Sequence, residues 1–421
     1  MAPKILFLLL SLCPLARAQY NLNFYLSRAL SYSPAIREFG DLQAGNRIQQ
    51  KLNHAVNSAF QLSLSGDYLF TPYFNNSGKL VTTEPEPEAI GYDIALFDGG
   101  LYSAQFNLER KLFNQNQISV LDRQSRIQDD NLRFGSELEQ HSVHHEVTGC
   151  YLKAWQALLL TRLAEETAAN LDQQLTLTGS LVRQGQAGLQ DYLLLRIESQ
   201  NQAIARNAAR QEYRTALYEL NALAGIQDTT VVEIDSLTLP LSAPLPASRF
   251  GDKFRLDSLA LNSRQEEFET RYRPELNLFV TAGLNAVTLQ KISRKFGTSA
   301  GLSLRWPLYD GRQKSLMRQQ TQLQQHSLHG YRQASAQNIA LQLNSSRARI
   351  RTLEGNLRTY TRQLEDYRQL LQLSEKQLQQ GATSMIDHLT LLRNYIEIRK
   401  ARISAEIECQ QEINNHNYWN W

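Results

Sequence analysis

The stretch Leu308-Tyr309-Asp310-Gly311-Arg312 decides the fold of this chain, because a related stretch, Leu96-Phe97-Asp98-Gly99-Gly100, occurs earlier. A second pair of stretches supports the same reading: GQAGLQD at 185–191 recurs as GATSMID at 381–387. Around each pair the order is two short alternating segments, an Asp-Gly, a very long polar segment, a glycine and a return segment. Repetition of this kind dictates architecture. It predicts an internal two-fold repeat and favours a channel wall over an enzyme.

The first residues have the form of an export signal. Met1-Ala2-Pro3-Lys4 is followed by an apolar run at 5–12 and by Ala16-Arg17-Ala18. A basic start, a short apolar run and an Ala-x-Ala site predict a secretory signal peptide over residues 1–18. The run is far below the roughly 18–20 residues of a spanning helix. Cys13 follows Leu12, where a lipoprotein signal needs a small residue, so we expect no lipid there.

Charge and cysteine content narrow the class further. The net charge is only +3, which suggests neither nucleic-acid binding nor an acidic tail. Beyond the signal peptide the only cysteines are Cys150 and Cys409. Counted along helices from the repeated glycines, they lie about 52 and 42 Å from the helix ends. A disulfide requires Cα atoms within about 7 Å, so we expect two buried thiols.

Four segments alternate apolar and polar residues with a period of two, at about 60–70, 89–97, 276–286 and 299–308. The first is representative, with Leu62, Leu64, Tyr68 and Phe70 opposing Gln61, Ser63, Ser65 and Asp67. This pattern, at this length, is typical of outer-membrane strands. A soluble β-sandwich is the alternative, but it is weakened because there are only four such segments, in two separated pairs.

Helix is predicted between and after these segments, in two long hairpins at about 99–224 and 311–418. Residues 98–185 contain no proline and would reach about 130 Å as a helix, and residues 311–381 would reach about 105 Å. A heptad stripe of spacings four and three runs through residues 353–378, which indicates one narrow contact line. Two further helices are expected at 34–59 and 252–273, with a proline-containing surface strap at 224–250.

On these anchors the chain resembles the outer-membrane efflux protein family, the TolC-like channels. The anchors are the Phe97-Asp98-Gly99-Gly100 turn, its echo Tyr309-Asp310-Gly311, Arg273-Pro274-Glu275-Leu276 before a strand, and the two Gly-to-Asp hairpins. The resemblance covers essentially the whole mature chain. We therefore expect a first structural repeat at 19–240 and a second at 241–421. Asp98, Gly99, Asp310 and Gly311 are expected to form the two strand-to-helix turns.

The resemblance implies a mainly α-helical fold with a β-barrel portion in the outer membrane of a Gram-negative bacterium. Each copy of a homotrimer would give four transmembrane strands to a twelve-stranded barrel, and its long hairpins would form a periplasmic α-helical barrel. The partners implied are outer-membrane lipid, a periplasmic adaptor (membrane fusion) protein and an inner-membrane transporter.

Oligomerisation also follows from the strands themselves. Membrane barrels begin at about eight strands, and open strand edges are not tolerated in lipid, so four strands cannot close alone. A dimer of eight strands and a trimer of twelve both satisfy this requirement. The resemblance favours the trimer.

The same resemblance implies that the tunnel closes at the hairpin turns, where an acidic ring on the second return helix narrows the pore. Asp387 occupies the first acidic position of that pattern, and Thr390 departs from it at the second. Three copies of Asp387 would concentrate negative charge and attract cations. The alternative is that Asp387 only stabilises the helix start. Thr383 and Leu378 occupy the places of the latch residues of some relatives, so a comparable latch is not evident.

The hairpin turns are also the expected docking surface for the adaptor, because they present glycine-broken backbone at the periplasmic end. The residues expected to make this contact are Leu181, Gln184, Gly185, Leu378, Gln380 and Gly381.

Other chemistry is not expected. His141, His144 and His145 are spaced for one helix face, but a zinc site needs three or four ligands, and no set is identifiable. No catalytic triad, phosphate loop or dinucleotide motif appears in a fitting context, so neither an enzyme nor a cofactor is expected. Two functions remain, a passive duct of a tripartite efflux or secretion system and a non-conducting periplasmic coiled-coil scaffold. Lipid-facing alternation favours the duct.

Overall fold

The computed structural model describes residues 20–70, 72, 74, 90, 100–186, 188–286, 289–380 and 382–421. Their contacts divide the chain into two units. We call residues 20–38, 136–250 and 334–421 the helical unit, and residues 39–135 and 251–333 the sheet unit. The expected signal peptide, and nearly all of the strand expected at 89–97, lie outside the described residues.

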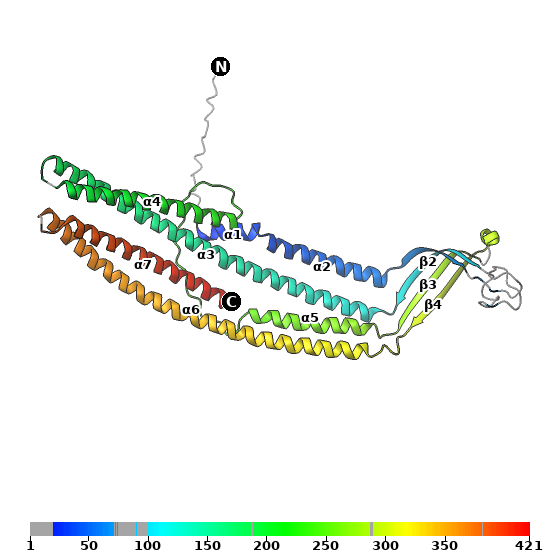
Figure 1. Cartoon of the computed structure of the whole chain (residues 1–421). Coiled ribbons are helices and arrows are strands. Elements are labelled where there is room, and N and C mark those ends of the chain that lie inside the picture. The colour runs from blue at the N-terminus through cyan, green and yellow to red at the C-terminus, as the bar shows by residue number, and fades with distance from the viewer. Residues whose placement is uncertain are drawn as a thin grey trace, which may run out of the picture. The chain divides into compact units, whose positions relative to one another are not determined.

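The described residues of the sheet unit form four antiparallel strands in the order β1-β2-β3-β4. The strands are β1 (Gln61–Phe70), β2 (Gly100–Leu112), β3 (Glu275–Ala286) and β4 (Phe296–Arg305), and the 3₁₀ helix η1 (Leu289–Arg294) lies between the last two. They extend from the ends of α2 (Pro34–Ser58), α3 (Gln115–Arg183), α5 (Phe250–Thr270) and α6 (Gln313–Gln379) (Figure 1). Helices α3 and α6 contribute their first parts to this unit and continue into the helical unit.

The helical unit is built from two helical hairpins. In it α3 and α6 are followed by the return helices α4 (Leu189–Leu223) and α7 (Met385–Trp419) (Figure 1). A short helix that the sequence analysis missed, α1 (Leu22–Tyr32), begins where the Asn21 side chain accepts a bond of 3.0 Å from the Phe24 N–H. The main core joins α1, α3 and α4 and includes Tyr25, Tyr151 and Leu217, which are 0–1 % exposed.

The expected strap at 224–250 is confirmed up to the start of α5. Its residues 226–245 form no helix or strand, and most of their side chains are exposed. It is held to α7 by side-chain amides: Gln410 accepts a bond of 2.7 Å from the Leu239 N–H, and Asn420 donates one of 2.7 Å to the Ala243 carbonyl. The strap therefore adds polar contacts along the return helix.

The second copy of the repeated order was predicted well. Strand β3 and helices α6 and α7 match their expected ranges, whereas β4 both begins and ends three residues earlier than the expected range 299–308. Asp310 and Gly311 form the strand-to-helix turn: the Asp310 carboxylate accepts bonds of 2.8 Å from the Arg312 and Lys314 N–H groups. Gly311 has φ +67°, a backbone conformation that favours glycine.

The predicted start of the first long helix, near residue 99, was wrong. Strand β2 occupies Gly100–Leu112, and α3 begins only at Gln115. Asp98 and Gly99 therefore precede a strand and are not a strand-to-helix turn; both lie outside the described residues. Residues 100–112 alternate with a period of two and pair on both sides with β1 and β3, and this tertiary pairing decides their conformation. The turn in this copy is at Phe113, with φ +53°.

Candidate functional site

The four strands present one apolar face and one polar face. On the apolar face the register aligns Leu64 with Phe106, Phe106 with Ala282, and Ala282 with Thr298. Most of the other described side chains on this face are Leu, Val, Ala, Phe or Tyr. Large apolar side chains on this face are exposed: Leu62, Leu64 and Phe296 are each 68–70 % exposed. A contiguous exposed apolar surface requires a membrane or a partner.

The opposite face is polar and internally hydrogen-bonded. Asn107 donates a bond of 2.8 Å to Ser65 Oγ, Ser103 donates one of 2.9 Å to Asp67, and Thr281 and Ser299 lie 2.7 Å apart. Such a face is suited to water. The alternation expected from the sequence is therefore present in space, with an apolar and a wet side on one sheet.

Both outer edges of this sheet are open. Within the described residues β1 pairs only with β2 and β4 pairs only with β3, so one backbone edge of each outer strand lacks a neighbour. Strand edges of this length are templates for pairing with another chain. The sheet is therefore incomplete as a single copy.

The two hairpin ends in the helical unit close with matching backbone bonds. In the first, Gln186 N–H donates a bond of 2.9 Å to the Leu181 carbonyl. In the second, Ala382 N–H donates one of 2.8 Å to the Gln377 carbonyl. Gly185 has φ +69°, and a Cβ there would meet nothing within 4 Å, so the glycine serves the turn rather than close packing. Gly381 lies outside the described residues.

The other expected docking residues differ in exposure. Leu181 is 42 % exposed, and Gln184 and Gln380 are exposed. Leu378 is half-buried against a small core of Leu171, Leu195, Met385 and Leu389. A groove of about 430 Å³ runs between the two hairpins here, lined by residues that include Leu177, Leu181, Asp191, Leu378 and His388. Its lining combines leucine side chains with carboxylates.

Asp387 and Thr390 are both exposed on the first turns of α7. Ser384 is the N-cap: its Oγ accepts a bond of 3.1 Å from the Asp387 N–H and donates one of 2.6 Å to Oδ2 of the same residue. Asp387 therefore does stabilise the helix start, as the alternative reading held. Its carboxylate is nonetheless exposed to solvent, so this contact at the helix start leaves it accessible to other groups.

An ion pair with one buried partner joins the two hairpins. Glu198 of α4 is 2 % exposed and accepts bonds of 3.0 and 2.6 Å from Nε and Nη2 of Arg393 on α7. Gln202 donates a third bond of 2.9 Å. Burial of Glu198 favours its neutral form, but the bonds from Arg393 and Gln202 outweigh it and lower the pKa of the carboxyl. Sequence reasoning missed this pair because its partners lie far apart along the chain.

Two buried histidines lie in the seam between α6 and α7. His388 Nδ1 is 3.1 Å from Ser374 Oγ, and His416 Nδ1 is 3.0 Å from Ser346 Oγ. The two pairs are separated by 28 residues on each helix, which is four heptads of the seam. Burial lowers the pKa of both imidazoles, so they are held neutral. They add polar layers to the predicted apolar stripe.

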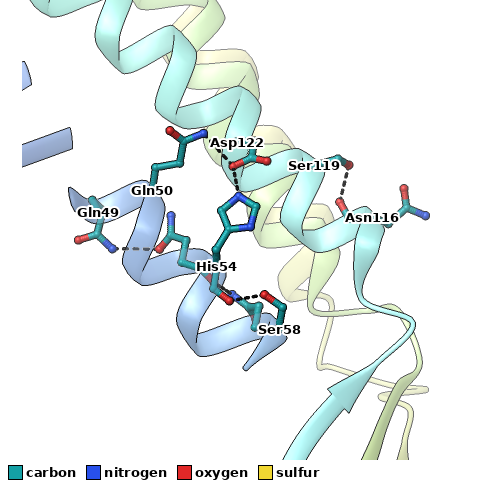
Figure 2. A network of polar contacts seen from close by, with 9 residues as sticks. Gln49, Gln50, His54, Ser58, Asn116, Ser119 and Asp122 are labelled. Carbon is teal, nitrogen blue, oxygen red and sulfur yellow. Dashed lines mark hydrogen bonds and ion pairs between the residues drawn. The ribbon is translucent and has the colours of Figure 1, made fainter. Parts of the chain in front are cut away.

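A polar network joins α2 to α3 in the sheet unit, close to β2. Figure 2 shows Gln50 and His54 on α2 pointing toward Asp122 on α3. Asp122 Oδ1 lies 2.9 Å from His54 Nε2 and 3.1 Å from Gln50 Nε2. Burial acts against the charged form of Asp122, but these two bonds prevail and lower the pKa of the carboxyl. The network anchors the helix that precedes β1 to the helix that follows β2.

The histidines considered as metal ligands have other contacts. His141 is stacked on Tyr418 and Trp421, with ring centroids 4.8 and 4.5 Å away, and His145 Nε2 lies 2.9 Å from Asn415 Oδ1. Across the described ranges no three His, Cys, Asp or Glu side chains come together as a metal site requires. Cys150 and Cys409 are not bonded to each other. Among the described residues no helix is both long and apolar enough to cross a membrane.

The sequence of the second copy of the repeated order matches a known protein family. The family model described as "Outer membrane efflux protein" matches residues 266–415, which contain β3, β4, α6 and most of α7. Over these residues the match confirms the resemblance drawn from the sequence. No curated protein matches the chain closely enough to report.

Solved channel structures share the fold. The structure of CusC has a TM-score of 0.73 at 15 % identity and covers 96 % of this chain and 92 % of its own. The Vibrio cholerae outer membrane protein VceC has a TM-score of 0.69 at 12 % identity, covering 95 % of each chain. The Neisseria gonorrhoeae MtrE outer membrane channel has a TM-score of 0.67 at 15 % identity, covering 95 % of this chain and 88 % of its own.

Proposed function

We propose that this chain, which matches the outer membrane efflux protein family over residues 266–415, is one subunit of a passive trimeric duct in a tripartite efflux or secretion system. The duct would lead from the periplasm through the outer membrane of a Gram-negative bacterium. The observation that carries the proposal is the four-stranded sheet, which has an apolar face, a polar face and two edges that no described strand pairs with.

These three features have one common solution. An apolar face of this extent is stable in lipid, but lipid does not tolerate the open edges of β1 and β4. Pairing the edge of β1 with the edge of β4 in the next copy removes both and closes a barrel with its polar face inward. Three copies give twelve strands, and the solved relatives have the same fold. A scaffold protein would have no use for such a sheet.

The two hairpin ends are proposed to serve opening and docking. Asp387 and Thr390 of three copies would surround the periplasmic aperture, and the exposed Asp387 carboxylates would attract cations there. Leu181, Gln184, Gly185, Leu378, Gln380 and Gly381 would contact a periplasmic adaptor that links the duct to an inner-membrane transporter. The groove between the hairpins offers both apolar and acidic contacts for that adaptor.

Planar-bilayer recording tests the proposal against the scaffold alternative. Purified protein should give stepwise conductance increments of uniform size, because a closed barrel holds a water-filled lumen. A non-conducting scaffold would give none at any protein concentration. Heat-denatured protein at the same concentration is the control.

A further inference from the structure

We propose that Arg110 of β2, together with Phe60, forms a binding site for the phosphate group of a phospholipid in the membrane leaflet nearer the helices. The inference rests on the proposed function, since it requires the apolar face of the sheet to lie in lipid. The inference adds a specific lipid ligand to the proposed function, which does not itself require one.

The place of Arg110 is unusual for a charged residue. In the register it is opposite Leu278, which is in turn opposite Leu302, so it belongs to the apolar face. It is the one charged residue on that face among the described strand residues. The other described side chains of the face that can form hydrogen bonds are the Thr298 hydroxyl and the Tyr68 and Tyr102 phenols. A lone arginine among lipid-facing side chains is costly unless its guanidinium reaches the polar boundary of the membrane.

Arg110 has no acidic partner in the described part of the chain. Its guanidinium carbon lies 4.9 Å from the centre of the Phe60 ring, which is itself 53 % exposed. The neighbouring Lys111 points to the polar face and lies 3.6 Å from Glu275. The charge of Lys111 is therefore matched by Glu275, whereas no acidic side chain among the described residues matches that of Arg110. Stacking on Phe60 orients the guanidinium and leaves its N–H groups free for an anion.

The height of Arg110 on the sheet matches the edge of a membrane. Along β2 it is eight residues from Tyr102, whose ring lies 5.1 Å from that of Tyr68. At a rise of about 3.3 Å per residue the two positions are about 26 Å apart along β2, which is about 20 Å of height for a strand tilted by about 40°. Arg110 would therefore lie within about 5 Å of the far edge of the roughly 25 Å apolar band, a distance that its long side chain can span. Near the Arg110 end, Phe113 and Trp306 are 89 and 58 % exposed. Exposed aromatic residues of this kind mark membrane–water boundaries.

A phospholipid fits these contacts better than a carboxylate from another copy. Strand β2 lies between β1 and β3, so a neighbouring sheet that pairs at the open edges does not reach Arg110. A guanidinium binds a phosphate group through two parallel hydrogen bonds. Phe60, Leu112 and Leu278 around it supply apolar surface for acyl chains. A free phosphate ion would gain nothing from that surface.

Native mass spectrometry of the delipidated protein in detergent tests the site. The probes are dimyristoyl phosphatidylglycerol, dimyristoyl glycerol, which lacks the phosphate, and inorganic phosphate. The wild type should bind the phospholipid about tenfold or more tightly than the diacylglycerol, the size expected for hydrogen bonds to a charged group. Arg110→Leu, which suits the lipid-facing position, should lose that preference, and Arg110→Lys should retain part of it.

The matched control is Arg305→Gln, at the same end of the sheet but on the polar face, opposite Glu275. It removes the same charge and should keep the wild-type preference. Unchanged phospholipid binding in Arg110→Leu, an equal loss in Arg305→Gln, or binding of inorganic phosphate as tight as that of the phospholipid would each overturn the site.

Recording the same preparations in planar bilayers separates this proposal from the proposed function. We expect both the wild type and Arg110→Leu to conduct, and only the variant to lose the preference for the phospholipid. If both conduct and both bind the phospholipid equally, the lipid site alone is wrong. If the wild type does not conduct, the membrane location fails and the lipid site fails with it.

Discussion

Replacing Arg393 with methionine is expected to loosen the hairpin ends and to raise the basal conductance of the duct. The methionine keeps an apolar stem of similar length but leaves the Glu198 carboxylate, 2 % exposed, without its cationic partner, while the bond from Gln202 remains. The two bonds lost measure 3.0 and 2.6 Å. Since they join α4 to α7, their loss should weaken the contact between the two hairpins.

The size of the effect follows from the burial of the two groups. Breaking a fully buried ion pair costs about 3–5 kcal/mol, whereas an exposed pair contributes about 0–1 kcal/mol. Glu198 is buried, but the Arg393 side chain is 57 % exposed, so we expect about 1–3 kcal/mol. Amide hydrogen exchange near these residues in α4 and α7 should therefore accelerate about 5- to 150-fold, at about 1.4 kcal/mol per factor of ten.

Arg402→Met is the matched control on the same helix. Arg402 lies 3.8 Å from Glu406 one turn away, an exposed pair whose loss should change exchange less than about threefold. Adding Glu198→Gln to Arg393→Met should recover part of the protection, because no unpaired charge remains buried. Equal exchange rates in Arg393→Met and Arg402→Met would refute the reasoning.

The pH dependence of the same pair gives a check of sign. The folded-state pKa of Glu198 is lowered, so its stabilisation is present above the unfolded-state value of about 4.3 and is lost as the pH falls through the folded value. The difference between wild type and Arg393→Met should accordingly be largest near neutral pH and should shrink below about pH 4.

Four further results are expected. Gly185→Glu should abolish export while the protein still assembles, because φ +69° costs a residue with a side chain about 1–2 kcal/mol and because the turn would carry a new charge. Gly185→Asn is the control, since asparagine tolerates this conformation, and it should export normally. Growth in a drug- or metal-tolerance assay measures export by both variants. Asp387→Ala should lower cation preference and block by multivalent cations in single-channel recordings, and unchanged selectivity would leave Asp387 with its capping role alone. Leu64→Lys should destabilise the membrane-inserted state by about 2–4 kcal/mol in urea unfolding from lipid, whereas Ser63→Lys on the polar face should change it little. Burial lowers the pKa of His388, so protection of the α6–α7 hairpin from amide hydrogen exchange should fall as the pH drops below about 6.5. His388→Gln should make that fall shallower. Identical pH profiles of exchange in the wild type and the variant would show that His388 does not cause the fall.

The second copy of the repeated order was predictable because local and tertiary signals agree there. Asp310 and Gly311 mark a turn by their side-chain chemistry, and the heptad stripe after them continues to the next glycine. In the first copy the Asp98-Gly99 pair resembles the same turn, but residues 100–112 carry an alternating pattern that pairs with two strands. The equivalent turn at Phe113 has no glycine, so sequence alone offered a weaker signal at the correct place.

The contacts of the candidate site were less accessible to sequence reasoning than its residue types. The repeated Gly-to-Asp tract indicates both hairpin ends, and the exposed Asp387 follows from its place on the first turn. The bond between Glu198 and Arg393 joins residues that are 195 positions apart, and no periodicity connects them. That no acidic side chain among the described residues pairs with Arg110 likewise becomes visible only when the register of β2 and β3 is known.

The central claim is that β1 of one copy pairs with β4 of the next, and engineered cysteines test it most directly. In one chain β1 and β4 are three strand spacings apart, about 14 Å, beyond the roughly 7 Å that a disulfide spans. With Cys150 and Cys409 replaced by alanine, Ser65→Cys is combined in turn with Ser299→Cys and Ser303→Cys to sample the register. Oxidised membranes should yield a covalent species of three chains on a non-reducing gel for at least one combination. Membrane-inserted protein that remains a single chain in every combination would contradict the account.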